Sequence, residues 1–334
     1  MKILYFTKGG RNVPSSNERV WIISDLLKAH YDWASDILSA RDASFWDALK
    51  KLYASKYDIL IVHKSLFSVW VFALIVLARF IFQKPMVFDL DDAQWVHSPF
   101  KSKVFAFTAR MVFAGSHEIK SWVERYNKNI VLIPTLVDHE HFARSPAVHG
   151  EKPIYTLGWV GAGPGHFQDG NFHLVKPALE ELGRRGKKIR FRVVGTRGYE
   201  PLETYLKSDL YEFEAVPFVP YSEVPKQIQQ FDIGIMPLVD TPFNRAKCGA
   251  KAIQYMACCV PPVVSPVGEN AIIVDDGVNG FCARTTEEWV SAIEKLLADA
   301  KLRSEFGVRG QEKVAREYSH MAVLKKYAHT VETL

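Results

Sequence analysis

Cysteine is scarce in this chain of 334 residues. The four cysteines are Cys248, Cys258, Cys259 and Cys282, and no CxxC pair is present. Cys258 and Cys259 are adjacent, and without a CxxC pair this cysteine usage argues against a disulfide framework and against a zinc site. It is typical of a reduced chain, so we expect a cytoplasmic protein.

Several motifs that would assign a function directly are also missing. No GxxxxGK[ST] P-loop occurs, and the glycine spacing of GWVGAGPGH, residues 158–166, does not match the dinucleotide fingerprint. The N-terminal MKILYFTKGG becomes polar too soon for a signal peptide and favours a buried first strand. The net charge of +5, from 42 basic and 37 acidic residues, permits an anionic ligand or membrane surface without requiring one. We expect no nucleic-acid partner.

Long apolar runs are absent except at residues 65–83. SLFSVWVFALIVLARFIFQ has Arg79 as its only charge and approaches the roughly 20 residues of a membrane span. Strand-like sequences on both sides favour a buried crossover helix instead. A helix in the membrane interface, with Trp70 and Phe72 among its anchors, is the alternative, and the nearby KSKVF and Arg110 suit an anionic surface or a solvated face. Peripheral contact with the inner face of a membrane therefore stays open.

Elsewhere, short apolar runs alternate with helical patterns. KILYF, YDILIVH, PMVFDL, RMVFAGS and NIVLIP are typical of buried parallel strands, and IYTLGWVG, IRFRVVG, YEFEAVPFV, DIGIMPL and PPVVSP form a second series. ERVWIISDLLKAH, HLVKPALEELGRRG and TEEWVSAIEKLLADA have helical spacing. The polar segment at 143–153 is typical of a linker. The pattern predicts an α/β fold with doubly wound domains at 1–148 and 149–318, followed by a helix at 319–334.

Every candidate motif follows a predicted strand. Ligands of open α/β sheets bind beyond the carboxyl ends of the strands. The motifs at such ends are Gly9-Gly10, Asp89–Asp92, Gly115-Ser116, Gly161–Gly165 and Lys247–Gln254. This agreement predicts an enzyme with a site in a cleft between two domains.

The aspartate cluster and the glycine turn each have more than one possible role. VFDLDDAQW, residues 87–95, has three carboxylates that could hold a divalent cation or place one carboxylate at a reaction centre. Asp89 could instead cap the next helix while Asp92 faces solvent. The glycine turn at 158–166 could bring backbone amides and a helix N-terminus to a diphosphate, or it could be only a tight turn.

RAKCGAKAIQYMACCVPPVVSPVGEN, residues 245–270, resembles the donor-binding motif of the retaining family-4 glycosyltransferases. IIVDDGVNGF, residues 272–281, is similar to the loop that follows in that family, and residues 114–142 resemble the segment closing its N-terminal domain. PSSNERVW and DLDDAQW resemble a subgroup with an aspartate-rich strand end. The resemblance implies a GT-B fold, with two Rossmann-like domains facing a cleft and a last helix that returns to the N-terminal domain.

The same resemblance implies an activity. The enzyme would move a sugar from a nucleotide-diphosphate sugar to a glycan or lipid-linked acceptor, with retention of configuration and without a metal ion or cofactor. The acceptor would bind the N-terminal domain and the donor the C-terminal domain. Asp91, or else Asp89, takes the place of a histidine that lies near the reacting sugar carbon in many members.

The chain departs from the family at the donor site. Ala246 and Gln254 stand where the family has two glutamates, although Gln254 can still hydrogen-bond a ribose hydroxyl. The usual arginine and lysine for the diphosphate are missing, and His166 alone is available there. We hypothesise that Lys247, Lys251 or both bind the diphosphate instead. Two cations at the start of a helix are unfavourable in the field of its dipole, and a bound anion would offset this. Solvated lysines are the alternative.

The resemblance thus predicts a set of binding residues. On the donor side these are Gly161, Gly163, His166, Val219, Lys247, Gly249, Lys251 and Gln254. On the acceptor side they are Gly9, Gly10, Arg19 and Ser116. Because both family glutamates are lost, a non-catalytic GT-B partner in a glycan assembly complex, or another GT-B nucleotide-sugar enzyme, remains an alternative.

Overall fold

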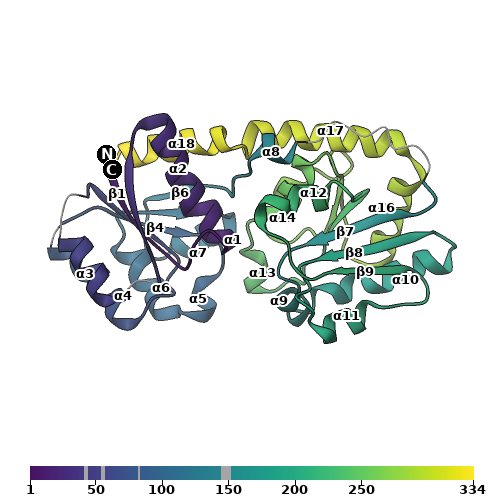
Figure 1. Ribbon diagram of the computed structural model, residues 1–334, viewed down its shortest axis with the longest axis horizontal. Helices are drawn as coiled ribbons and strands as arrows, with labels where there is room; N and C mark the ends of the chain where they lie inside the picture. The colour runs from purple at the N-terminus through teal and green to yellow at the C-terminus, as the bar shows by residue number, and fades with distance from the viewer. Residues whose placement is uncertain (41–43, 54–56, 82, 144–151) are drawn as a thin grey trace. The chain divides into compact units, whose positions relative to one another are not determined.

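The computed structural model describes residues 1–40, 44–53, 57–81, 83–143 and 152–334. Residues 144–151, most of the predicted linker, lie outside this part. The chain divides into two compact units (Figure 1). Unit 1 contains Met1–Leu136, Ala246–Cys248 and His320–Leu334, and unit 2 contains Val137–Arg245 and Gly249–Ser319.

Unit 1 is built on a parallel six-stranded sheet in the order β2-β1-β3-β4-β5-β6. Its strands are β1 (Lys2–Thr7), β2 (Ala34–Ser39), β3 (Ile59–His63), β4 (Met86–Leu90), β5 (Met111–Ala114) and β6 (Ile130–Leu132). The strand order reverses between β1 and β3, which is where open α/β sheets bind ligands. The register pairs His63 on β3 with Asp89 on β4, so their polar strand ends meet.

Helices cover both faces of this sheet. They are α1 (Pro14–Ser16), the π-helix η1 (Asn17–Trp21), α2 (Ile22–Tyr31), α3 (Phe45–Tyr53), α4 (Val69–Ile81), α5 (Gln94–His97), α6 (Pro99–Thr108), α7 (His117–Val123) and α18 (His320–Glu332). Figure 1 shows α2 and α18 on one face and α3, α4 and α6 on the other. Side chains of α2 and α18 share one buried cluster with β1, β3 and β5.

Unit 2 has a second parallel sheet, in the order β12-β11-β10-β7-β8-β9. Its strands are β7 (Tyr155–Val160), β8 (Ile189–Val194), β9 (Glu212–Val216), β10 (Ile233–Met236), β11 (Pro262–Val264) and β12 (Phe281–Cys282). The order reverses between β7 and β10. The carboxyl end of β7 carries the glycine turn, which places that turn at the second reversal point.

The helices of unit 2 also pack on both faces of their sheet. They are α8 (His139–Phe142), α9 (Gly163–Gln168), the 3₁₀ helix η2 (Asn171–Leu174), α10 (Lys176–Arg184), α11 (Glu200–Leu206), η3 (Tyr221–Glu223), α12 (Val224–Ile228), α13 (Pro242–Arg245), α14 (Ala250–Ala257), α15 (Asn270–Ile273), α16 (Thr286–Ala298) and α17 (Ala300–Glu317). One buried cluster joins the sheet to α10, α11 and α16, and another joins it to α12 and α14. The predicted α/β fold with two parallel sheets is confirmed.

Candidate functional site

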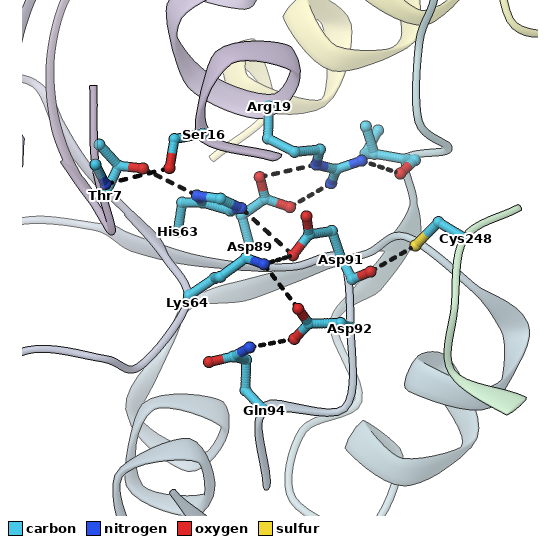
Figure 2. Close-up of polar contacts among 12 residues, drawn as sticks. Thr7, Ser16, Arg19, His63, Lys64, Asp89, Asp91, Asp92, Gln94 and Cys248 are labelled. Carbon is cyan, nitrogen blue, oxygen red and sulfur yellow. Dashed lines mark hydrogen bonds and ion pairs between the residues drawn. The ribbon is translucent and has the colours of Figure 1, made fainter. Parts of the chain in front are cut away.

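The aspartates after β4 surround a buried lysine. Lys64 Nζ lies 2.9 Å from Asp91 Oδ1 and 2.7 Å from Asp92 Oδ2 (Figure 2). Gln94 donates a hydrogen bond to the other oxygen of Asp92. The side chains of Lys64 and Asp91 are only 5% and 10% exposed, so the ammonium and the carboxylate meet in a largely water-free place. Within the described ranges, no group of three or more acidic, histidine or cysteine side chains could hold a metal ion.

The backbone at Lys64 is unusual. Its φ of 68° lies in the left-handed region, which lysine rarely adopts. The residue follows the last residue of β3, and its N–H donates to Asp89 O at 3.1 Å. Such strained residues cluster at functional sites, at a cost of about 1–3 kcal/mol each. The conformation turns the Lys64 side chain toward the aspartates of the neighbouring strand end.

Asp91 is held as a carboxylate. Burial alone would raise its pKa, but the neighbouring Lys64 and His63 outweigh burial and hold the pKa of Asp91 well below its usual range. Burial likewise opposes the charge of Lys64, and Asp91 and Asp92 together raise the pKa of Lys64 above its ordinary value. The pair is therefore ionised throughout the neutral range.

His63 completes this cluster from the buried side. It is fully buried at the end of β3, and its Nδ1 lies 3.0 Å from Thr7 Oγ1 at the end of β1. Its Nε2 lies 3.5 Å from Asp91 Oδ1 (Figure 2). The carboxyl ends of three adjacent strands, β1, β3 and β4, are thus joined by polar side chains at the reversal point of the sheet.

Asp89 and Arg19 form a buried ion pair. Arg19 donates from Nε and Nη2 to the two oxygens of the Asp89 carboxylate and from Nη1 to the carbonyl oxygens of Ile133 and Pro134, and the two side chains are 4% and 1% exposed. Burial lowers the pKa of Arg19, but the charge of Asp89 outweighs it and raises the pKa above its ordinary value. This geometry argues against the predictions that Asp89 is catalytic and that Arg19 binds the acceptor. Asp89 does not cap the following helix either.

The other predicted acceptor-side residues organise the backbone. Ser116 is fully buried, accepts from Ile119 N as the cap of α7, and donates to Ala246 O at 3.0 Å. Gly9 N donates to Ser16 Oγ, and the Trp21 indole donates to Gly9 O. Gly10 accepts from Val13 N. These contacts give Ser116 and the glycine pair a structural role, and their contact with an acceptor remains a prediction.

In unit 2, Lys251 lies over the glycine turn. Its Nζ is 5.2 Å from the centroid of the Trp159 ring, within cation–π range. A Cβ at Gly161, whose φ is 152°, would lie only 2.6 Å from Lys251 Cε. Lys251 stands in the first turn of α14, so its charge opposes the helix dipole. The structure thus brings Lys251, Gly161 and Trp159 together at the end of β7.

His166 packs beside the same tryptophan. Its ring centroid is 4.7 Å from that of Trp159, and its Nδ1 lies 3.2 Å from Asn171 Nδ2. The Asn171 oxygen accepts from Val239 N and from Asn244, and a backbone N–H can only donate, so the orientation of this amide is fixed. Asn171 therefore donates to His166 Nδ1. The proton of the neutral imidazole is on Nε2.

The glycines of the turn are needed for close packing. Gly161 N donates to Val194 O, and Gly163 N donates to Gly195 O. A Cβ at Gly195 would lie 1.9 Å from Gly161 O. Because both amides are engaged in the protein, they do not form the phosphate cradle that the sequence allowed. The tight-turn alternative fits these two glycines better.

The remaining predicted donor residues are dispersed over three segments. Gly249 precedes α14 with φ 67°, and a Cβ there would meet Ile273 at 2.2 Å, so glycine is required. Gln254 is half-buried on α14. Val219 is half-buried after β9 and packs on the core. Lys247 belongs to the short Ala246–Cys248 segment of unit 1, whereas Lys251 belongs to unit 2.

Sequence reasoning missed four residues of these clusters: His63, Lys64, Trp159 and Asn171. His63 and Lys64 had a usable signal, because they follow the strand YDILIVH just as Asp89 follows PMVF. Equivalent strand ends of a parallel sheet meet at one edge. Asn171 had none, since its role depends on Val239, 68 residues later in the chain.

Solved structures of similar architecture identify the fold. HepE of Anabaena in complex with UDP-glucose shares 16% identity and a TM-score of 0.72, with 100% of both chains covered. Sucrose-phosphate synthase of Thermosynechococcus elongatus shares 14% identity and a TM-score of 0.73, covering 100% of this chain and 98% of that one. A glycosyltransferase of Rickettsia africae shares 14% identity and a TM-score of 0.70, covering 98% and 97%.

The protein has the GT-B fold. Within this GT-B fold, residues 155–299 match the family model described as glycosyl transferases group 1. No curated protein matches the chain significantly. The family match and the GT-B neighbours together support a glycosyltransferase. Among the described residues, no helix is both long and apolar enough to cross a membrane.

Proposed function

We propose that the protein is a glycosyltransferase that moves a sugar from a nucleotide-diphosphate sugar to an acceptor, with retention of configuration. The observation that carries this proposal is the match of residues 155–299 to the group 1 glycosyl transferases. The matched region contains the turn at the end of β7 and helix α14. We assign the donor to unit 2 and the acceptor to unit 1. UDP and UDP-glucose, which HepE binds, are the first ligands to test.

Lys251 is the proposed partner of the leaving diphosphate. An ammonium in the first turn of α14 is unfavourable in the helix dipole, and a bound anion would offset this. Charge-assisted hydrogen bonds are also stronger than neutral ones. Protein cations would then neutralise the developing charge, so the proposed reaction needs no metal ion.

His166 is proposed as a neutral donor beside Lys251. Asn171 fixes the tautomer with the proton on Nε2, so the imidazole can donate to a phosphate or sugar oxygen without carrying a charge. Gln254 on α14 is proposed to bind the ribose, and the backbone at Val219 the base. These roles complete the donor side.

On the acceptor side, Asp91 is proposed as the group at the reaction centre. Its Oδ1 is held by Lys64 and His63, and Oδ2 takes no part in those two contacts. An ionised carboxylate could accept a hydrogen bond from a sugar hydroxyl or stabilise an oxocarbenium-like centre. Catalysis would come from positioning and charge stabilisation, without a covalent enzyme nucleophile.

The proposed acceptor is a glycan, free or linked to a lipid. A lipid-linked acceptor would be found at a membrane, so we place the reaction in the cytoplasm at the inner face of that membrane. The apolar segment at 65–83 is the part of the chain proposed to contact it.

Titration calorimetry with UDP and UDP-glucose tests the donor site. Replacing Lys251 by alanine should weaken binding by about 10- to 100-fold, because a charged hydrogen bond contributes about 1.5–3 kcal/mol. Lys301→Ala is the matched control, since that lysine is exposed on α17 of the same unit and should leave affinity unchanged. Equal affinities for the wild type and Lys251→Ala would remove Lys251 from the site.

Transfer assays then separate an enzyme from a binding partner. With a sugar acceptor, we expect a product whose anomeric configuration by NMR equals that of the donor, at a rate unaffected by EDTA. Nucleotide binding without transfer or donor hydrolysis would favour the non-catalytic alternative. No binding of any nucleotide diphosphate would contradict the proposed function itself.

A further inference from the structure

The outer surface of unit 1 carries an unusual group of apolar side chains. Among the described residues, nine of the fifteen large apolar side chains that are exposed lie between Trp46 and Phe107. Single exposed apolar residues are ordinary, but contiguous apolar patches mark surfaces that bind a partner or a membrane. The question is whether these nine form one surface.

Helix α4 supplies most of them. Its exposed large side chains are Val69, Trp70, Leu77, Phe80 and Ile81. At 100° per residue these five fall on one side of the helix, and Ala73 and Val76 between them are also apolar. The opposite side, with Val71, Phe72 and Ile75, is buried. The helix is therefore apolar on the side away from the core, where a surface helix is normally polar.

Helix α6 extends this surface. The buried Phe72 of α4 packs on Phe105 of α6 with ring centroids 5.0 Å apart, and Arg79 of α4 donates to Thr108 O of α6 at 3.3 Å. The two helices are therefore neighbours on the same face of the sheet (Figure 1). Phe100 and Phe107 of α6 are 70% and 73% exposed. We call these two residues and the five of α4 the α4–α6 face.

On α4 and α6 themselves all charges have one sign, whereas the neighbouring α3 carries Asp47 beside Lys50 and Lys51. The charged residues within 65–88 and 93–117 are Arg79, Lys84, Lys101, Lys103 and Arg110. Lys103 and Arg110 are exposed, and no aspartate or glutamate occurs in either segment. Basic residues that flank an apolar surface attract anionic lipid head groups, each contributing about 1 kcal/mol near the surface. Trp70 on the face and Trp46 on the adjacent α3 have the amphipathic rings favoured at membrane interfaces.

We propose that the α4–α6 face docks on a bilayer surface containing anionic phospholipid. The apolar side chains enter the boundary between head groups and acyl chains, and the surrounding cations meet the lipid phosphates. Helix α4 has 13 residues, too few to span the bilayer, so it lies in the interface plane. A second copy of the chain suits the face less well, because two such faces would bring together like charges.

Flotation of the whole protein with lipid vesicles tests this proposal independently of any transferase activity. The vesicles are phosphatidylcholine alone or phosphatidylcholine with about a third phosphatidylglycerol. The wild type should float with the anionic vesicles and much less with the neutral ones. Raising the salt to about 0.5 M should lower the bound fraction, because the Debye length falls well below 10 Å.

Paired variants locate the surface. Trp70→Ser/Phe80→Ser should weaken vesicle binding at least about tenfold, since each side chain loses burial in the bilayer. The matched control is Leu210→Ser/Val278→Ser, two exposed apolar residues of unit 2, which should bind like the wild type. Because all four side chains are exposed, both proteins should fold, and circular dichroism checks this.

Three results would overturn the proposal. The first is that the wild type does not float with anionic vesicles. The second is that Trp70→Ser/Phe80→Ser binds these vesicles with unchanged affinity. The third is that the wild type forms a dimer that dissociates in this variant, while neither protein binds vesicles. Nucleotide binding should be equal in both double variants. Vesicle binding without any transfer would contradict the proposed function and leave the docking surface standing.

Discussion

At the scale of residues, the Arg19–Asp89 pair links helix η1 to strand β4 in the buried part of unit 1. Both side chains are almost completely buried, and Arg19 also ties down the carbonyl oxygens of Ile133 and Pro134. Removing one member of such a pair leaves an uncompensated buried charge, which costs about 3–5 kcal/mol. We therefore expect Arg19→Met to lower the free energy of unfolding of unit 1 by this amount, as measured by urea denaturation.

Two further variants make this prediction specific. Arg19→Met/Asp89→Leu should recover much of the loss, because no charge is then left unpaired. Arg11→Ala breaks the Arg11–Asp25 pair, whose side chains are 53% and 58% exposed, and should cost at most about 1 kcal/mol. If Arg19→Met were no more damaging than Arg11→Ala, the pair would not have the structural role assigned here.

The same residues show how far a sequence predicts a site. The strand ends and the aspartates were predictable, because polar residues follow apolar runs. The choice among Asp89, Asp91 and Asp92 was not, because it depends on partners distant in the chain. Asp89 meets Arg19 across 70 residues, and Asp92 meets Lys64 across 28. No local pattern encodes these pairings.

At the scale of elements, the apolar pattern predicted which strands exist better than it predicted where elements begin and end. It also missed strands at the edges of the sheets. The ten predicted strands are present, whereas β2 (ASDILS) and β12 were missed. Both are edge strands, and β2 is largely half-exposed, so neither needs a continuous apolar run. The run at 65–83 forms a helix only from Val69 to Ile81. Ser68 caps its start by accepting from Val71 N, and Gln83 with φ 51° follows its end.

Helix α14 lies close to its sheet because β10 has a glycine at the contact. A Cβ at Gly234 would lie 2.4 Å from the Tyr255 ring, which is fully buried and donates to Ile235 O. Gly234→Ala should therefore displace α14 and destabilise unit 2 by about 1–3 kcal/mol in urea denaturation, as overpacking does. Because α14 carries Lys251, nucleotide affinity should fall too.

Gly165→Ala in the same unit is the matched control. A Cβ there would meet nothing within 4 Å, and the residue lies in helix α9. Alanine in a helix is favoured over glycine by about 0.5–1 kcal/mol, so stability should be equal or slightly higher. Similar losses from both substitutions would refute packing at Gly234 as the cause.

At the scale of the whole molecule, the chain builds unit 1 from its two ends. Helix α18, the last of the chain, packs in the same buried cluster as β1, the first strand. The hydroxyls of Tyr327 and Tyr5 lie 3.2 Å apart, and the ring of Tyr327 is 5.0 Å from that of Phe113. Unit 1 therefore includes residues 320–334 in its core, whereas unit 2 contains no residue of α18.

Removal of residues 320–334 should accordingly act on one unit alone. It takes Leu324, Tyr327 and Val331 out of the core of unit 1, where each large side chain contributes about 2–5 kcal/mol, so that unit should lose its cooperative urea transition. Unit 2 should keep its transition and its nucleotide affinity. Tyr327→Phe removes only the hydroxyl contact and should lower the free energy of unfolding of unit 1 by about 0.5–1.5 kcal/mol. A loss this small would show that packing of the ring contributes more than the hydrogen bond. A truncated chain with both transitions intact would show that the helix is dispensable.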